Sequence, residues 1–184
     1  NHTTATPRAV GVIGLGAMGA GMAQSLRRAG HHVHVHDIRP EAAAAFAAEG
    51  GTACATLADM AAACRIIVSV VVNARQTEAV LFGEGGIAPA LQPGSVFIMC
   101  STVDPNWSVA LEARLQAQGV HYIDAPISGG AAKAASGQMT MMTAGRPEAY
   151  AACEGVLDAM AAKVYRLGDS AGAGSKVKII NQLL

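Results

Sequence analysis

The sequence has few charged residues and no excess of either sign. Of its 184 residues 14% are charged, with 13 basic and 13 acidic side chains, so the formal net charge is zero. A protein that binds nucleic acid or an acidic membrane surface needs a basic face, and this balance argues against both kinds of partner. Apolar residues make up 52% of the chain, which is typical of a folded protein with a sizeable core.

Long apolar runs and closely spaced cysteines are also missing. The longest aliphatic stretch, residues 66–72, contains Ser69 and is far shorter than the ~20 residues that a membrane-spanning helix needs. The four cysteines include no CxxC pair, so neither a zinc knuckle nor a redox dithiol is indicated. We therefore expect reduced thiols in or near the core of a cytoplasmic protein.

What the chain does contain is a regular alternation of buried-strand and helix patterns. Strands are expected at 9–15, 32–38, 65–72, 95–100, 120–124, 138–143 and 163–167, and helices at 17–29, 41–49, 57–64, 76–82, 106–118 and 148–160. This order predicts an α/β fold, a Rossmann-like doubly wound parallel sheet with right-handed crossovers. We place a disordered tail at 1–8 and the sheet domain at 9–171. A further helix is expected to begin in 172–184, with an apolar stripe that finds no partner in the chain.

A glycine motif lies where the first strand meets the first helix. Its six residues are Gly14, Leu15, Gly16, Ala17, Met18 and Gly19. In this context the first glycine permits a tight turn, the second lets backbone approach a pyrophosphate, and the third lets the helix pack on the strand. The helix N-terminus supplies N–H groups and a positive dipole for the phosphates. The motif predicts a dinucleotide site.

Asp37 follows at the end of the second expected strand, 18 positions after Gly19. A carboxylate there accepts hydrogen bonds from the ribose hydroxyls and repels a 2′-phosphate, so NAD is favoured over NADP. Arg39 is a complication, because its guanidinium can pair with that phosphate. Asp37 can alternatively be a turn carboxylate beside Arg39.

Four histidines near the second strand, His31, His32, His34 and His36, resemble a metal tract. A zinc site needs converging ligands, usually from more than one element, and no further His or Cys cluster supplies them. We interpret this strand face as partly solvated, beside the adenosine pocket, and expect no metal.

Residues 13–26 (IGLGAMGAGMAQSL) closely resemble the opening signature of the β-hydroxyacid dehydrogenases, the family of 3-hydroxyisobutyrate dehydrogenase and of the cofactor domain of 6-phosphogluconate dehydrogenase. Three more segments match family motifs. Residues 101–105 (STVDP) resemble the loop after the fifth strand, 124–130 (DAPISGG) the substrate loop, and 172–178 (GAGSKVK) the GxGxxxK segment. Family members usually continue into an all-helical domain, so the resemblance implies that 172–184 begin the interdomain helix.

Within the family, three segments are similar to the L-threonate dehydrogenase branch: residues 71–83, 131–133 and 163–165. The resemblance implies hydride transfer from the carbinol carbon of a small hydroxy or sugar acid to NAD. Lys178, at the spacing of the family's catalytic lysine, would be the general acid/base. Asn181 would orient the substrate, although Gln182 is an equally placed amide. The family's helical domain implies a homo-oligomer.

The resemblance also implies positions for the remaining site residues. Ser128, Gly129 and Gly130 would offer backbone N–H groups and a hydroxyl to a substrate carboxylate, and Thr102 would lie between cofactor and substrate. Asn73 follows the central strand at its carboxyl end and can meet the nicotinamide ribose; Asn73 and Thr102 can alternatively be helix caps. The expected cofactor contacts are completed by Ile38, Val72 and Thr77.

Two other functions stay open at this point. An NADP-dependent reductase of a semialdehyde, of the tartronate semialdehyde or glyoxylate type, is the nearest alternative. A non-catalytic NAD(H)-binding module is the second, and the presence of both Lys178 and the Ser128–Gly130 loop argues against it.

Overall fold

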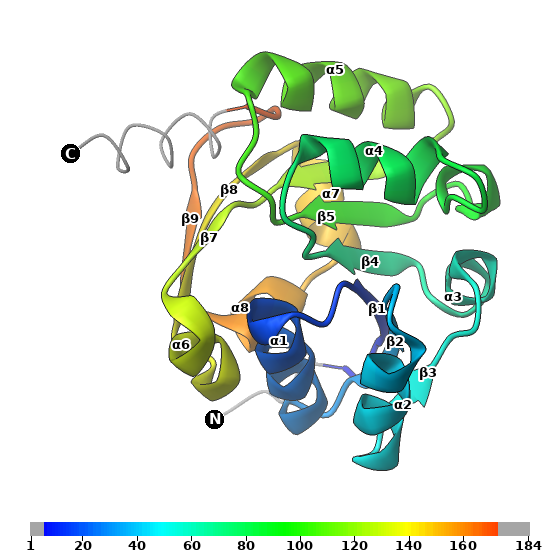
Figure 1. Ribbon diagram of the computed structural model, residues 1–184. Helices are drawn as coiled ribbons and strands as arrows, with labels where there is room; N and C mark the ends of the chain where they lie inside the picture. The colour runs from blue at the N-terminus through cyan, green and yellow to red at the C-terminus, as the bar shows by residue number, and fades with distance from the viewer. Residues whose placement is uncertain (1–5, 173–184) are drawn as a thin grey trace.

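The computed structural model describes residues 6–172, which form an α/β fold with helices on both faces of a central sheet (Figure 1). The strands are β1 Ala9–Ile13, β2 His32–His36, β3 Thr52–Ala53, β4 Ile66–Ser69, β5 Val96–Met99, β6 His121–Asp124, β7 Ile127–Ser128, β8 Met139–Gly145 and β9 Ala161–Arg166. The helices are α1 Ala17–Arg28, α2 Pro40–Ala48, α3 Leu57–Ala63, α4 Ala74–Phe82, the 3-10 helix η1 Ala88–Ala90, α5 Pro105–Gln116, α6 Gly130–Ser136, α7 Pro147–Ala152 and α8 Val156–Met160.

The sheet runs in the order β3-β2-β1-β4-β5-β6-β8-β7, with β9 paired to β8. From β3 to β6 every neighbouring pair is parallel. The strand order reverses beside β1, because the chain first builds outward to β3 and then continues from β4 on the other side of β1. In doubly wound sheets, ligands bind at the carboxyl ends of the strands next to such a reversal.

Each face of the sheet has its own apolar core, since central parallel strands bury side chains on both sides. On one face, Met22 and Leu26 of α1 pack with Val10 and Val12 and with side chains of α2, α6, α7 and α8. On the other face, Met60 of α3 packs with Ile13, Ile67 and residues of α4 and α5. Figure 1 shows α4 and α5 on the side of the sheet opposite α1, α6 and α8.

The prediction for the C-terminal third of the sheet is wrong in orientation and in its helices. The segment expected to extend the parallel sheet, β8, runs antiparallel to β6 and to β7. Two short elements, β7 and α6, were not predicted. The single helix expected at 148–160 is two helices, α7 and α8, separated at Gly155, whose φ of 86° belongs to the left-handed region.

Arg8, the last residue of the expected disordered tail, is hydrogen-bonded to the folded part of the chain. The backbone N–H of Arg8 donates to His31 Nδ1 at 3.0 Å, and its guanidinium donates to the Ala152 carbonyl at 3.0 Å. Arg8 is therefore part of the folded unit. Across residues 6–172, no helix is long and apolar enough to cross a membrane.

Candidate functional site

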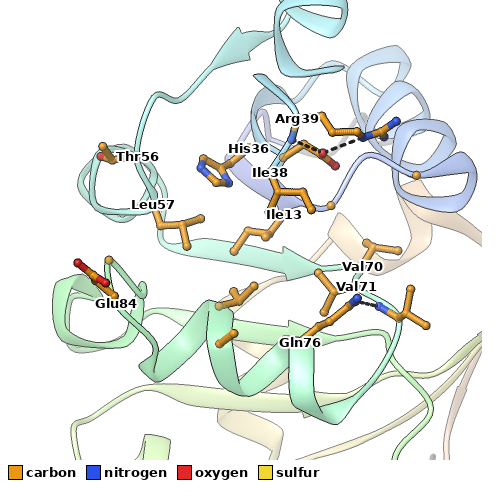
Figure 2. Close-up of a pocket in the computed structure, with 17 residues that line it drawn as sticks. Ile13, His36, Ile38, Arg39, Thr56, Leu57, Val70, Val71, Gln76 and Glu84 are labelled. Atoms are coloured by element: carbon orange, nitrogen blue, oxygen red, sulfur yellow. Dashed lines mark hydrogen bonds and ion pairs between the residues drawn. The ribbon is translucent and has the colours of Figure 1, made fainter. Parts of the chain in front are cut away.

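A cavity of about 640 Å³ lies at the carboxyl ends of β1, β2 and β4 (Figure 2). This volume is within the range of ligand pockets, about 300–1,000 Å³. Five predicted site residues line it: Gly14, Gly16, Asp37, Ile38 and Val72. The lining residues that the prediction did not assign are Ile13, His36, Arg39, Thr56, Leu57, Val70, Val71, Gln76, Ala79, Val80, Glu84 and Gly85.

The three glycines of the motif meet different surroundings. At Gly14, with φ of 95°, a Cβ would lie 2.5 Å from the Val70 carbonyl oxygen. At Gly19 a Cβ would lie 1.9 Å from the Gly14 carbonyl oxygen, so the fold itself requires glycine at both positions. A Cβ on Gly16 would meet no other heavy atom of residues 6–172 within 4 Å. The space beside Gly16 is open to the cavity, and it is the space that a closely approaching phosphate would fill.

The N-terminus of α1 opens from this loop. Gly16 is its N-cap and has no side chain with which to cap it, and the first turn holds no acidic residue among the described positions. The first N–H groups of a helix have no intrahelical partner and carry a partial positive charge. The 12-residue helix α1 therefore presents an anion-binding end to the cavity. Ala17, Met18 and Gly19 form this turn without lining the cavity themselves.

Asp37 follows β2 and holds two backbone segments together. Its Oδ2 accepts the Leu15 N–H at 2.7 Å, and its Oδ1 accepts the Arg39 N–H at 2.8 Å. Burial pushes the pKa of this carboxyl up, but these bonds and the Arg39 guanidinium outweigh that effect, so the pKa lies below its ordinary value. Asp37 is therefore ionised at neutral pH, and it lies at the wall of the cavity.

The Arg39 side chain lies beside that carboxylate at the cavity edge (Figure 2). Its Nε is 3.3 Å from Asp37 Oδ1, while 57% of the side chain stays exposed. An ion pair this open to solvent contributes little to stability. The edge of the cavity therefore carries one negative group with a buried side chain, Asp37, and one exposed positive group, Arg39.

Two large apolar side chains line the cavity but remain exposed. Ile38 is 94% exposed and Val72 is 78% exposed. Ile38 follows β2 and Val72 follows β4, and these two strands flank β1 in the sheet. Exposed apolar surface that rims a cavity is typical of a site for a flat apolar group, such as an aromatic ring.

The loop after β4 is fixed by a reciprocal cap on α4. Asn73 Oδ1 accepts the Gln76 N–H at 2.9 Å, and Gln76 Oε1 accepts the Val72 N–H at 2.7 Å. Thr77 is fully buried, and its hydroxyl donates to the Asn73 carbonyl at 2.9 Å. The structure thus shows Asn73 as a helix cap, and it places Thr77 inside the fold rather than on the cavity wall.

The expected substrate residues lie elsewhere on the same edge. Thr102 is half-buried in the loop after β5, next to Ser101, whose hydroxyl donates to the Val71 carbonyl at 2.6 Å. The cap of α5 is Asp104, not Thr102. Ser128 lies in β7 opposite Thr140. None of Thr102, Ser128, Gly129 and Gly130 lines the 640 Å³ cavity.

The glycines after Ser128 have a distinctive backbone. Gly129 has φ of 142° and Gly130 has φ of 77°, and Gly129 is the N-cap of α6. Both glycines are exposed. Lys178 and Asn181 lie outside the described residues.

Histidines and cysteines play structural roles in the described part of the chain. His36 lines the cavity, and burial lowers the pKa values of His34 and His36. No group of three His, Cys, Asp or Glu side chains within 6–172 is arranged to hold a metal. All four cysteines are buried and unpaired, which confirms the core thiols, and burial raises the pKa of Cys64, Cys100 and Cys153 to about 12.

Comparisons with known proteins place this geometry in context. Residues 9–168 match the family model described as the NAD binding domain of 6-phosphogluconate dehydrogenase. L-threonate dehydrogenase of Cupriavidus necator is 59% identical over 177 residues, which cover 96% of this chain and 60% of that protein. The L-threonate dehydrogenase of Pectobacterium atrosepticum is 45% identical over 180 residues, covering 96% of this chain and 58% of the relative.

A solved structure shows the same arrangement. The crystal structure of 3-hydroxyisobutyrate dehydrogenase from Salmonella typhimurium superposes with a TM-score of 0.91 at 44% identity, covering 96% of this chain and 61% of that one. The chain thus spans about 60% of the length of these relatives.

Proposed function

This chain belongs to the family of the NAD-binding domain of 6-phosphogluconate dehydrogenase, in its β-hydroxyacid dehydrogenase branch, and from that premise we propose that it is the cofactor domain of an enzyme that oxidises a small sugar acid of the L-threonate type with NAD. When bound, the dinucleotide supplies the hydride acceptor. The residues of this chain bind it, orient the substrate and move the proton.

The open space beside Gly16 is the observation that carries the proposal. The fold requires the glycines at 14 and 19, whereas residues 6–172 place nothing against position 16. A glycine that neighbouring atoms do not require is explained by a ligand that approaches the backbone closely. The uncapped N-terminus of α1 beside it suits the negative charge of a pyrophosphate.

The ionised Asp37 supports NAD over NADP. Its carboxylate lies at the cavity wall with its pKa lowered, so a 2′-phosphate there would meet a negative charge, while ribose hydroxyls can donate hydrogen bonds to it. We assign apolar contacts with the adenine ring to Ile38 and Val72, and their exposure at the cavity wall supports this role.

Arg39 keeps the NADP-linked semialdehyde reductase as the second candidate. More than half of its side chain is exposed, and a guanidinium can pair with a 2′-phosphate. Calorimetric titration of the chain with NAD and with NADP separates the two. We expect NAD to bind more tightly, and Arg39→Ala to weaken NADP binding more than NAD binding. Tighter binding of NADP by the unmodified chain would contradict the proposal.

Lys178 is our candidate for the group that removes the proton from the substrate hydroxyl and returns it in the reverse reaction. A lysine that acts as a base near neutral pH must be partly desolvated or lie near another cation. Ser128, Gly129 and Gly130 would receive the substrate carboxylate, with the Ser128 hydroxyl and the backbone N–H groups of the two exposed glycines as donors. Asn181 would orient the substrate hydroxyl.

Substrate and catalysis are tested on the native full-length protein. NADH formation is measured with L-threonate, 3-hydroxyisobutyrate and other hydroxy acids, and we expect L-threonate to have the highest kcat/KM. Lys178→Ala should lower kcat by about 100-fold or more, the typical contribution of a general acid/base, with little change in NAD affinity. Full turnover by Lys178→Ala would remove this residue from the mechanism. NAD binding without turnover of any hydroxy acid would support the non-catalytic module.

The organisation of the whole protein is part of the same proposal. The cofactor domain would comprise residues 9–171, and 172–184 would begin a helix leading into a helical domain through which copies associate. The relatives' greater length supports this view. Sedimentation analysis of the full-length protein tests the oligomer. The cytoplasmic location expected from the sequence stays a prediction.

A further inference from the structure

Two buried carboxylates, one at the end of β6 and one in α5, hold the peptide at residues 171 and 172. Asp124 Oδ2 accepts the Gly172 N–H at 3.0 Å, and Glu112 Oε2 accepts the Ala171 N–H at 3.1 Å. Asp124 is fully buried and Glu112 is 6% exposed. One carboxylate ends β6 and the other lies within α5, so two elements distant in sequence from residues 171 and 172 bind consecutive N–H groups.

Because both carboxyl groups are buried, losing either hydrogen bond would destabilise the folded protein. A carboxylate taken out of water must be paired or hydrogen-bonded. The pKa of Glu112 lies above its ordinary value: burial raises it and the neighbouring Asp124 adds to the rise, while the Ala171 N–H and the charge of Arg146 oppose it. If either hydrogen bond is lost, a buried polar group is left unsatisfied, at a cost of about 1–3 kcal/mol. The peptide at 171 and 172 is therefore held more firmly than an ordinary loop.

Side-chain and backbone packing also hold Ala171 and Gly172 in place. The Ala171 side chain is buried and belongs to the apolar cluster that contains Val103 and Leu111. Gly172 has φ of 102°, and a Cβ there would lie 3.2 Å from Val109 Cγ2 and 3.3 Å from the Pro105 carbonyl oxygen. Position 172 thus needs glycine for its backbone conformation and has no spare room toward α5.

Resting on the proposed function, we propose that Asp124 and Glu112 are positioning residues that anchor the peptide at 171 and 172 and thereby set where the segment bearing Lys178 leaves the sheet. Lys178 follows Gly172 by six residues. Six residues span at most about 20 Å even when fully extended, so the position of the peptide at 171 and 172 limits where the Lys178 amine can lie. Misplacement of a reacting group by about 1 Å can lower a rate by about 100-fold.

The test compares truncating and conservative variants of the native full-length protein. Asp124→Ala and Glu112→Ala remove the acceptor, while Asp124→Asn and Glu112→Gln keep one oxygen that can accept the same N–H. Glu78→Ala is the matched control. It removes a carboxylate of α4 that forms a salt bridge with Arg114, and Arg114 lies in α5, the helix that also carries Glu112. Where Asp124→Ala does not fold, Glu112→Ala and Glu112→Gln decide the outcome.

Two readouts are measured on each variant. We expect the alanine variants to lower kcat by about 10- to 100-fold while the NAD dissociation constant stays within about two-fold, and the amide variants to recover most of the loss. Hydrogen–deuterium exchange without cofactor should show faster exchange in peptides covering 167–178 for the alanine variants alone. Glu78→Ala should match the unmodified protein in both readouts.

Unchanged kcat and unchanged exchange in a folded alanine variant would overturn the anchor. So would a loss of NAD affinity equal to the loss of kcat, since that pattern indicates general destabilisation. Lys178→Ala is run in parallel. If it abolishes turnover while Glu112→Ala does not lower it, the anchor fails and the proposed function stands. If Lys178→Ala retains turnover, the proposed role of the lysine fails, and the exchange data still decide whether the carboxylates hold the peptide.

Discussion

Alanine at position 16 should separate binding of the dinucleotide from folding of the domain. The backbone of Gly16 is extended, with φ of −63° and ψ of −175°, so alanine adopts it without strain. No described atom lies within 4 Å of the added methyl group. Two small terms oppose each other: alanine restricts the unfolded chain, worth about 0.4–1 kcal/mol, and is a poorer N-cap than glycine by a similar amount. The free energy of unfolding should therefore change by less than about 1 kcal/mol.

Binding of NAD should respond quite differently to Gly16→Ala. The methyl group would occupy the space where a phosphate meets the first N–H groups of α1. Losing one hydrogen bond to a charged group costs about 1.5–3 kcal/mol, and about 1.4 kcal/mol corresponds to a tenfold change in affinity. We expect the dissociation constant for NAD to rise by about 10- to 100-fold.

Gly19→Ala provides the matched comparison in the same motif. Its Cβ would lie 1.9 Å from the Gly14 carbonyl oxygen and 2.9 Å from the carbonyl carbon, and both are backbone atoms that cannot turn away. Overpacking of this kind costs about 1–3 kcal/mol or more, so this variant should unfold at a lower temperature.

Thermal unfolding and calorimetric NAD titration are measured on the unmodified protein, Gly16→Ala and Gly19→Ala. A Gly16→Ala variant with unchanged Tm and unchanged NAD affinity would refute the argument that a ligand requires this glycine. One that loses stability as Gly19→Ala does would show that the fold, not the ligand, requires it.

Three further predictions concern the stability of the described fold. Burial lowers the pKa of His31 in the folded protein, so as pH falls through about 6.5 this histidine binds a proton in the unfolded chain before it does so in the folded protein. The free energy of unfolding, measured with urea, should therefore decrease from pH 7 to pH 5. The decrease should be shallower in His31→Asn. Gly21→Ala should lower Tm by several degrees, because its Cβ would lie 2.6 Å from a backbone nitrogen of α6. Asn73→Ala should lower the free energy of unfolding by about 1 kcal/mol through loss of the α4 cap, and Asn73→Ser should restore most of it.

The parallel half of the sheet, apart from the two-residue strand β3 that was not expected, could be predicted because its longer strands and its helices are local patterns. The largest boundary errors in this half are informative. The expected strand at 65–72 ends at Ser69, and the expected strand at 32–38 ends at His36. The residues beyond those ends, Val70 to Val72 and Ile38, line the cavity instead. Their apolar character serves a ligand site, which a hydrophobicity pattern cannot distinguish from a buried strand.

The antiparallel part could not be derived in the same way. A buried strand has the same apolar pattern in either orientation, so nothing local in β8 indicates its direction. The helix α6 did have a signal, since residues 130–136 contain four alanines and end at Gly137, which caps the helix with φ of 73°. The Ser-Gly-Gly motif is interpreted as a ligand-binding loop, although its second glycine, Gly130, is also the first residue of α6.

In the candidate site too, residues within a local sequence motif could be predicted, whereas residues whose role depends on contacts between distant segments could not. The glycine motif and Asp37 could be found from the sequence because their spacing carries the chemistry. Gln76 could not, because its hydrogen bond to the Val72 N–H depends on how the loop folds over α4. Glu112 is a charged residue in the middle of a helix, which usually faces solvent. Only its contact with Ala171, 59 residues away, gives it a role.

The Asp37 carboxylate links the glycine loop to the turn after β2, and this limits how cofactor preference can change. One carboxylate oxygen holds the glycine loop through Leu15, and the other holds the turn that carries Arg39. Replacing the carboxylate to admit a 2′-phosphate would leave the Leu15 N–H without this acceptor and loosen the loop that faces the pyrophosphate. Affinity for both dinucleotides would then fall together. The Arg39 side chain does not hold the glycine loop, and its salt bridge with Asp37 contributes little to stability because the guanidinium is mostly exposed. Changes at position 39 can therefore alter the discrimination between NAD and NADP without disturbing the phosphate site, whereas changes at position 37 cannot.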